Sequence, residues 1–70
     1  MSMTDVHHTI WVAYGRSGVV GSIRKDDEGF TVTMAGASSA AGNYPTMEIA
    51  KNALHAAMTP GSDWPEFREH

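Results

Sequence analysis

Three stretches of the chain alternate between apolar and polar side chains, which is the pattern of half-buried β-strands. They span residues 8–14, 19–25 and 30–34, and the alternation is cleanest in the third stretch. The segments that separate them, residues 15–18 and 26–29, have the glycines and polar side chains of tight turns. Parallel strands would need a long crossover connection. Because both connections are short, the pattern predicts an antiparallel meander of three strands.

One amphipathic helix is predicted after these strands. Thr46 is suited to the N-cap position, Pro45 precedes it, and Glu48 falls in the first turn, where the helix dipole favours a carboxylate. The apolar residues cluster on one side of the helical wheel: Met47, Ala50, Leu54, Ala57 and Met58. The opposite side carries Glu48, Lys51, Asn52 and His55. This separation predicts a helix that packs its alanine-rich side on the sheet and stops at residues 59–61.

The segment between the third stretch and the helix leaves two possibilities open. Residues 36–42, with the sequence GASSAAG, are small and low in complexity. They fit either a mobile loop or the tip of a hairpin that leads to a short edge strand at residues 43–44.

The C-terminal residues carry a second capping pattern. Asp63 and Glu66 have the D-x-x-E spacing of a capping box, and Pro65 fits the first turn of a helix, where its missing N–H costs nothing. We therefore expect a short C-terminal helical turn, which places Trp64 and Phe67 side by side.

These elements predict an α+β fold: a three-stranded antiparallel meander with one C-terminal amphipathic helix packed on one face (β-β-β-α), followed by the short helical turn. Residues 1–6 should form a frayed N-terminus, residues 7–58 a single domain, and residues 59–70 a tail. The more apolar face should receive the helix, and it would carry Ile10, Val12, Tyr14, Val19, Ile23, Phe30, Val32 and Met34. The other face would then carry Thr9, Trp11, Ala13, Val20, Ser22, Arg24, Thr31 and Thr33.

The composition limits what so short a chain can do. Its 70 residues suffice for one domain, which buries only about 60% of the surface of the unfolded chain. Domains of this size usually depend on disulfides, a metal or an oligomer for stability. The sequence has no Cys, so disulfides, thiolate metal sites and cysteine nucleophiles are excluded.

We expect neither an enzyme nor a metal or cofactor site. His7 and His8 are adjacent, so that in a strand they point to opposite faces and cannot hold one ion together. Only an irregular start would let them join Asp5 or His70. Acid–base or hydrolytic catalysis needs a positioned nucleophile with a base, or paired carboxylates in a cleft. The acidic residues 26–28 are consecutive in a turn, which indicates a solvated loop.

The predicted helix-free face has the composition of a binding surface. Trp11 and Arg24 are residue types enriched in interface hot spots. Thr31 and Thr33 would lie beside them, with Arg16 in the adjoining turn. These five residues form the predicted binding face, with Trp11 as its anchor.

Trp11 also has an alternative environment. The C-terminal segment with Trp64 and Phe67 can fold back over its face, or a second copy of the chain can cover it. The two tail aromatics are accordingly either a latch on their own chain or an anchor for another protein.

The charge balance and the length of the apolar stretches narrow the partners further. Five Lys and Arg against eight Asp and Glu give a net charge of −3, which disfavours nucleic acid because that affinity comes from basic side chains. The longest apolar stretch, residues 10–14, is far shorter than the roughly 20 residues of a membrane span. Residues 1–8 lack the pattern of a signal peptide. We expect a cytoplasmic, non-catalytic protein-interaction or accessory module that self-associates and has no membrane partner.

The order of three strands and a helix also carries a family resemblance. The residues around the start of the helix read Gly42-x-Tyr44-x-Thr46-x-x-Ile49-Ala50. In this motif and in element order, residues 8–58 resemble uncharacterised small bacterial and phage β-β-β-α proteins, the arm-type DNA-binding domains of phage integrases and the plant ethylene-response-factor domain. The resemblance implies an alternative function, nucleic-acid binding by the sheet face. Those domains carry many Lys and Arg on the sheet, whereas residues 1–61 here hold four basic and five acidic residues.

Overall fold

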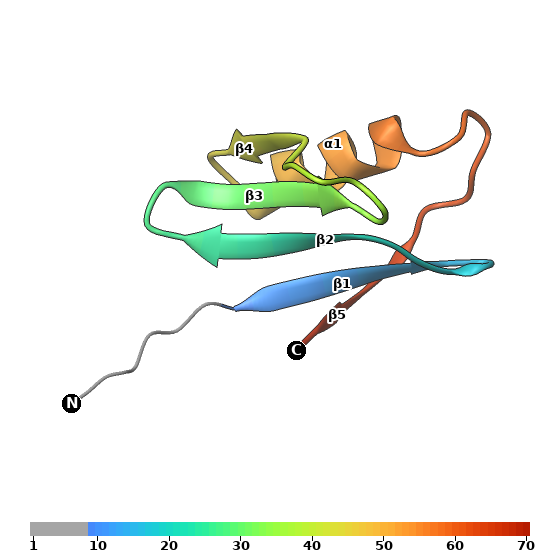
Figure 1. Cartoon of the computed structure of the whole chain (residues 1–70), viewed down its shortest axis with the longest axis horizontal. Helices are drawn as coiled ribbons and strands as arrows, with labels where there is room; N and C mark the ends of the chain where they lie inside the picture. Colours follow the sequence, from blue (N-terminus) through green and yellow to red (C-terminus); the bar gives the residue numbers. More distant parts are fainter. Residues whose placement is uncertain (1–8) are drawn as a thin grey trace.

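The computed structural model describes residues 9–70, which form one sheet and one helix (Figure 1). Along the chain the elements are β1 (Ile10–Gly15), β2 (Gly18–Asp26), β3 (Gly29–Met34), β4 (Gly42–Tyr44), α1 (Met47–Ala57) and β5 (Glu66–Glu69). The strands lie in the order β4-β3-β2-β1-β5, and every neighbouring pair is antiparallel. The predicted frayed segment, residues 1–6, lies outside the described residues, as do His7 and His8.

The α+β class and the antiparallel meander are confirmed, but the sheet has five strands instead of the predicted three. Strand β4 extends one edge and contains residues 43–44, which the sequence placed either in an edge strand or after a loop. Strand β5 extends the other edge. The helix connects the two edge strands, so the chain crosses the sheet between β4 and β5.

The predicted C-terminal helical turn is wrong, because Glu66–Glu69 is a strand that pairs with β1. A single turn of helix is unstable in water, since its first hydrogen bond has to order several residues at once. Pairing with β1 satisfies backbone groups of both strands. It also places Phe67 opposite Ala13, on the side of the sheet that carries the helix.

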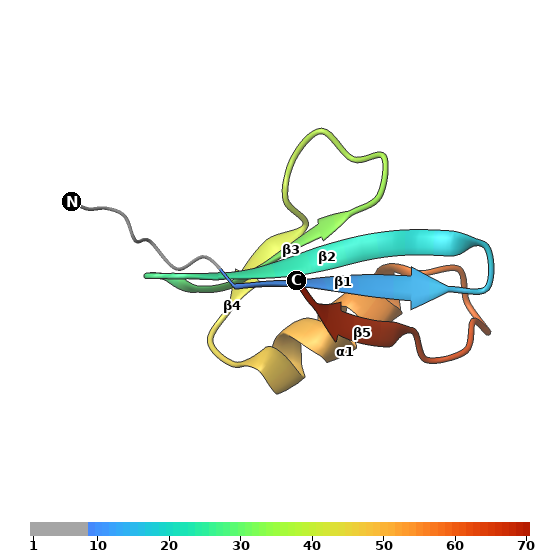
Figure 2. The ribbon, with the colours of Figure 1, turned by 90° about the horizontal axis from the view of Figure 1, so that it is seen from below.

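Helix α1 begins at the predicted N-cap. The Oγ1 atom of Thr46 accepts a hydrogen bond of 3.1 Å from the backbone N–H of Ile49. Ala50 and Leu54 are the buried residues of the helix, and Ala57, which was expected on the same side, is exposed at its end. The helix contacts β2, β3 and β4 and lies on one side of the sheet (Figure 2).

The two faces of β1 are the reverse of the prediction. In the pairing of β1 with β2, Trp11 lies opposite Ile23 and Ala13 opposite Gly21. Cross-strand partners share a face of the sheet. Trp11 and Ala13 therefore lie on the helix side, where Ala13 is fully buried. Ile10, Val12 and Tyr14 lie on the other face.

The core under the helix is small. Its fully buried apolar residues are Ala13, Ile23, Val32, Ala50 and Leu54. Larger side chains surround these five and stay partly exposed, among them Trp11, Phe30, Met34, Tyr44 and Phe67. With so few buried side chains, the fold has little stability to spare.

Gly29 is required by the turn between β2 and β3. Its φ is +129°, and a Cβ at this position would lie 2.5 Å from the carbonyl oxygen of Tyr44. We expect Gly29→Ala to lower the free energy of unfolding by about 2 kcal/mol, measured by urea denaturation. Gly18→Ala is the matched control, because Gly18 has a φ of +121° but a Cβ added to it would lie in open space. It should cost only about 1 kcal/mol. Equal losses would contradict the role of the Tyr44 contact.

Candidate binding surface

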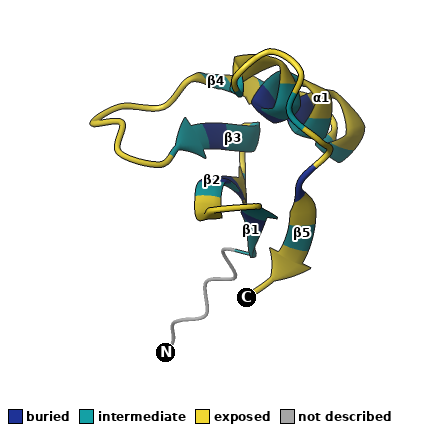
Figure 3. Ribbon diagram, turned by 90° about the vertical axis from the view of Figure 1, so that its right-hand side faces the viewer, coloured by how far each residue is buried: buried dark blue, intermediate teal, exposed yellow. Residues whose placement is uncertain are grey.

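The side of the sheet opposite to α1 is uncovered in the described structure, and we refer to it as the open face. Strand pairing places Ile10, Arg24, Thr31 and Asn43 in one row across it, and Val12, Ser22, Thr33 and Arg68 in the next. Tyr14 lies beyond them on β1. The loop of residues 35–41 rises from the sheet on this side (Figure 2), and all of its residues are exposed (Figure 3).

The open face combines an apolar strip with a hydroxyl strip. Ile10, Val12 and Tyr14 follow one another along β1 and are half-buried. The prediction that Val19 lies on the helix side is also wrong: it lies opposite Tyr14 on the open face and is 52% exposed, because the pairing of β1 with β2 shifts register between Ala13 and Tyr14. The adjacent strands β2 and β3 carry Ser22, Thr31 and Thr33, with the exposed side chain of Arg24 beside them.

Only part of the predicted binding face is brought together. Arg24 lies directly opposite Thr31, and Thr33 is on the same side of the sheet. Arg16 is in the turn between β1 and β2, at the far end of both strands.

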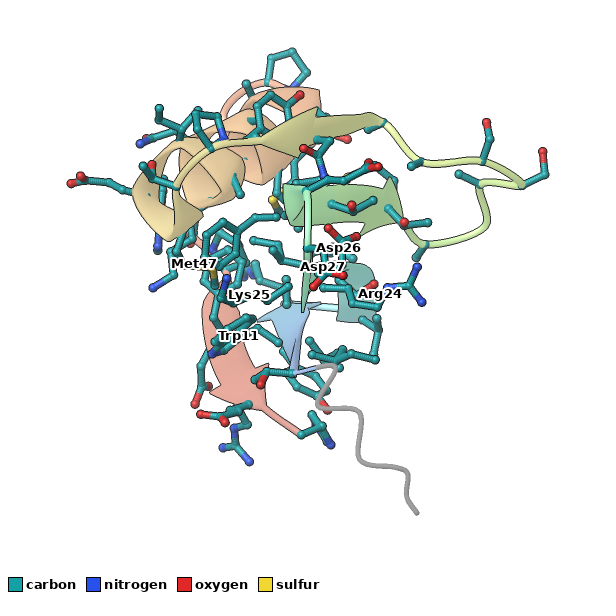
Figure 4. The ribbon with its side chains drawn as sticks, turned by 90° about the vertical axis from the view of Figure 1, so that its left-hand side faces the viewer. Trp11, Arg24, Lys25, Asp26, Asp27 and Met47 are labelled. Carbon is teal, nitrogen blue, oxygen red and sulfur yellow. The ribbon has the colours of Figure 1, made fainter. Side chains whose placement is uncertain are left out.

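Trp11 does not belong to this face. Its ring lies 6.1 Å from that of Phe30, at the border of the core on the helix side. Figure 4 shows Trp11 with Lys25 and Met47 under the helix, and Arg24 on the other side. The prediction that Trp11 lies on the binding face is therefore wrong. The register of β1 against β2 places Trp11 opposite Ile23, on the helix side of the sheet. Trp11 is therefore not the anchor of the open face.

A chain of hydrogen bonds crosses the open face where β2, β3 and β4 meet. The carboxylate of Asp26 accepts a hydrogen bond of 2.9 Å from the backbone N–H of Glu28, and one of 3.1 Å from the hydroxyl of Thr31. The amide of Asn43 donates to the same hydroxyl at 2.9 Å. The backbone N–H of Glu28 is the main cause that lowers the pKa of Asp26 below its ordinary value of 3.8. Partial desolvation opposes this shift, and the Thr31 hydroxyl and the charge of Arg24 add to it.

The lowered pKa of Asp26 predicts a loss of stability in acid. Its ionised form is favoured in the folded state, so the contribution is complete above the ordinary value of 3.8 and disappears as the pH falls through the lower folded value. We expect Asp26→Asn to be less stable than the parent at neutral pH, with the difference shrinking below pH 3.8. Urea denaturation over a series of pH values measures it. Asp27→Asn removes the same charge from an exposed side chain without hydrogen bonds to residues 9–70. An equal pH dependence for both variants would contradict the role of the hydrogen bonds.

The two tail aromatics lie side by side as predicted, although a strand and its preceding loop place them, not a helical turn. The ring of Trp64 is 6.2 Å from Phe67 and 4.8 Å from His55 on α1. The Nε2 atom of His55 donates a hydrogen bond of 2.9 Å to the carbonyl oxygen of Ser62. The ammonium of Lys51 lies 5.2 Å from the Phe67 ring. The tail is thus held against its own helix, while Trp64 keeps 52% of its surface exposed.

An open groove lies between the turn of β1 and β2 and the loop that joins α1 to β5. Its volume is about 950 Å³, and its apolar lining includes Val20, Met34, Met58 and Trp64. Arg16 lines one part of it, and Glu66 another. The sequence gives no sign of this groove, because its lining comes from segments far apart along the chain.

The described residues offer little else for ligand chemistry. Within residues 9–70 no group of three or more His, Cys, Asp and Glu side chains is arranged to hold a metal ion. The alternative cluster, in which Asp5 or His70 joins His7 and His8, depends on residues outside that range. No helix in the described part has the length and apolar character to cross a membrane. Comparison of the chain with protein-family models, curated proteins and solved structures finds no significant match.

Proposed function

We propose that this chain is a small, non-catalytic protein-interaction module that binds its partner with the open face. The observation that carries the proposal is the one-sided cover of the sheet. Helix α1 packs on one side, and the other side keeps the apolar strip of Ile10, Val12 and Tyr14 within reach of solvent. Apolar side chains gathered on a solvent-accessible face are typical of surfaces that contact another protein.

The chemistry of the open face indicates the kind of partner. Arg24 is exposed, and within residues 9–70 it has no ion pair. An Arg beside an apolar strip fits a protein surface that has an apolar patch bordered by a carboxylate. We also propose that the module self-associates, because its core is small and a partner subunit can supply the missing burial.

The alternative is nucleic-acid binding by the same face, as in the integrase-arm domains. The hydroxyl strip and Arg24 are compatible with it. However, Arg24 is followed within four residues by Asp26, Asp27 and Glu28, and the net charge is −3. Phosphate groups would be repelled where the arginine has to meet them. A protein partner is therefore the better-supported proposal.

Photo-crosslinking in cells of the natural source tests the proposal. A photoreactive residue at Ser22 lies on the open face, and one at the exposed Ala56 of α1 serves as control. We expect protein adducts from position 22 and few from position 56. Arg24→Glu should reduce the adducts about ten-fold. Lys25→Glu changes the same charge on the helix side, where Lys25 lies 5.1 Å from the Phe30 ring, and should leave them.

Two outcomes would overturn the proposal. A nucleic-acid adduct at position 22, together with salt-sensitive binding of a DNA duplex that Arg24→Glu weakens, would favour the alternative. Equal protein adducts at both positions would mean that the open face is not the preferred surface.

A further inference from the structure

The free edge of β5 has the features of a junction between two copies of the chain. Strand β5 is the last in the sheet order, and within residues 9–70 no segment pairs with its outer edge. The backbone N–H of His70 donates a hydrogen bond of 2.7 Å to the carbonyl of Ile10. Backbone groups alternate in direction along a strand. Those of Glu66 and Arg68 therefore point toward β1, and those of Phe67 and Glu69 point outward.

The charges of β5 are complementary to themselves when two such strands run antiparallel. Glu66 and Arg68 lie on the open face, and the Arg68 Nε atom is 3.0 Å from the Glu66 carboxylate. A two-fold axis at Phe67 would place each Glu66 opposite the Arg68 of the other copy. Opposite charges at directly facing positions stabilise antiparallel pairs. The same register pairs the outward backbone groups of the two Phe67 residues.

The neighbouring registers lose one or both of these features. An axis at Arg68 brings two arginines together, and an axis at Glu66 brings two glutamates together, which is unfavourable. An axis between two residues sets outward backbone groups against inward ones, so that no ladder forms. Charged side chains normally protect a sheet edge from such pairing. On β5, by contrast, the spacing of Glu66 and Arg68 favours one register, the one with its two-fold axis at Phe67.

We propose that two copies of this chain join through β5 around Phe67, an inference that rests on the proposed self-association and gives it a geometry. The two sheets then form one continuous sheet, and the two open faces become one surface with two-fold symmetry. On the helix side, the two Phe67 side chains then face each other, and the half-exposed Trp64 of each copy lies 6.2 Å from its own Phe67 ring. A partner that presents two equivalent sites gains from this doubling through avidity.

A charge-swap experiment on the full chain tests the junction. Glu66→Arg makes both positions basic, and Arg68→Glu makes both acidic. Each variant alone should dimerise at least about ten-fold more weakly than the parent, as measured by sedimentation equilibrium. A one-to-one mixture restores both opposite-charge contacts, so it should form a heterodimer of nearly parental affinity. The two side chains are 64% and 66% exposed, so both variants should fold, which circular dichroism checks.

A disulfide measurement gives a second, independent result. The chain has no Cys, so each introduced thiol is the only one. Under mild oxidation, Glu66→Cys mixed with Arg68→Cys should give the mixed disulfide faster than either variant links to itself, because directly facing positions have the required spacing.

The outcomes separate this inference from the proposed function. Parental dimerisation of both charge variants alone, or a mixture that stays monomeric, would overturn the junction. If Val12→Lys on the open face dissociates the dimer and the two charge variants do not, the junction at β5 is overturned, but the proposed self-association stands. A parent chain that is monomeric at every concentration would overturn it too, whereas the photo-crosslinks at Ser22 still report on the open face.

Discussion

Leu54→Ala should lower the free energy of unfolding by about 4 kcal/mol, the largest loss that we expect from a single truncation in this chain. Leu54 is fully buried, and one of its methyl groups packs so close to Gly21 of β2 that a Cβ added to this glycine would lie 3.2 Å from it. Removing it deletes buried apolar atoms and leaves a cavity between helix and sheet. A domain of this size has a total stability of only about 4–10 kcal/mol. The variant should therefore be largely unfolded at temperatures where the parent is folded.

Ile49→Ala is the matched control on the same helix. Ile49 is 46% exposed, so its truncation should cost less than about 1 kcal/mol. Urea denaturation followed by circular dichroism measures both variants, and thermal unfolding gives a second reading. Similar midpoints for the two variants would contradict the orientation of α1 on the sheet.

Trp11→Ala should cost about 3 kcal/mol, because the indole packs at the border of the core against Phe30 on the helix side. Val12→Thr, one residue along β1, replaces a half-buried side chain on the open face by one of similar shape. It should cost less than about 1 kcal/mol. If Val12 lay on the helix side and Trp11 on the open face, as the alternation alone predicts, Val12→Thr would cost more stability than Trp11→Ala. Urea midpoints of the two variants therefore test the register of β1, and a larger loss for Val12→Thr would contradict it.

The position of Trp11 changes what the candidate surface can be. A surface anchored by Trp11 would centre on one large aromatic side chain. The open face instead offers the strip of Ile10, Val12 and Tyr14, with Arg24 on the next strand. Its Tyr14 pairs with Glu66 of β5, and its phenol oxygen is 3.0 Å from Nε2 of His70, the residue that follows this strand. Strand β5 therefore both fixes one end of the open face and carries the edge that we propose as the junction.

Part of the candidate surface was predictable from the sequence. Arg24, Thr31 and Thr33 were expected on one face, and they share it, because β2 and β3 each have one side that is clearly more apolar over this region. Strand β1 is apolar on both sides, with Ile10, Val12 and Tyr14 alternating against Trp11 and Ala13. Its alternation identifies a strand but contains no preference for a side. The small side chain of Ala13, which lies opposite Gly21 under the helix, is the one local sign of the correct side.

The C-terminal strand was not predictable by the same means. Asp63 and Glu66 match a capping box, and the local pattern is compatible with a helical turn. Whether four residues form a turn or a strand depends on a partner, and the free edge of β1 provides one. The groove between the β1–β2 turn and the loop before β5 was not predictable either, because the segments that line it are far apart in the sequence and come together only in the folded chain.

The sequence by itself determined the elements that depend on neighbours along the chain. Alternation marks β1, β2 and β3, the turn residues close their hairpins, and Thr46 starts the helix, since each of these is a short-range effect. The tertiary structure alone decided the side on which β1 is buried, the pairing of β5 with β1, and hence the composition of the open face. These depend on strand register and on the small space under α1, both of which come from contacts between residues far apart in sequence.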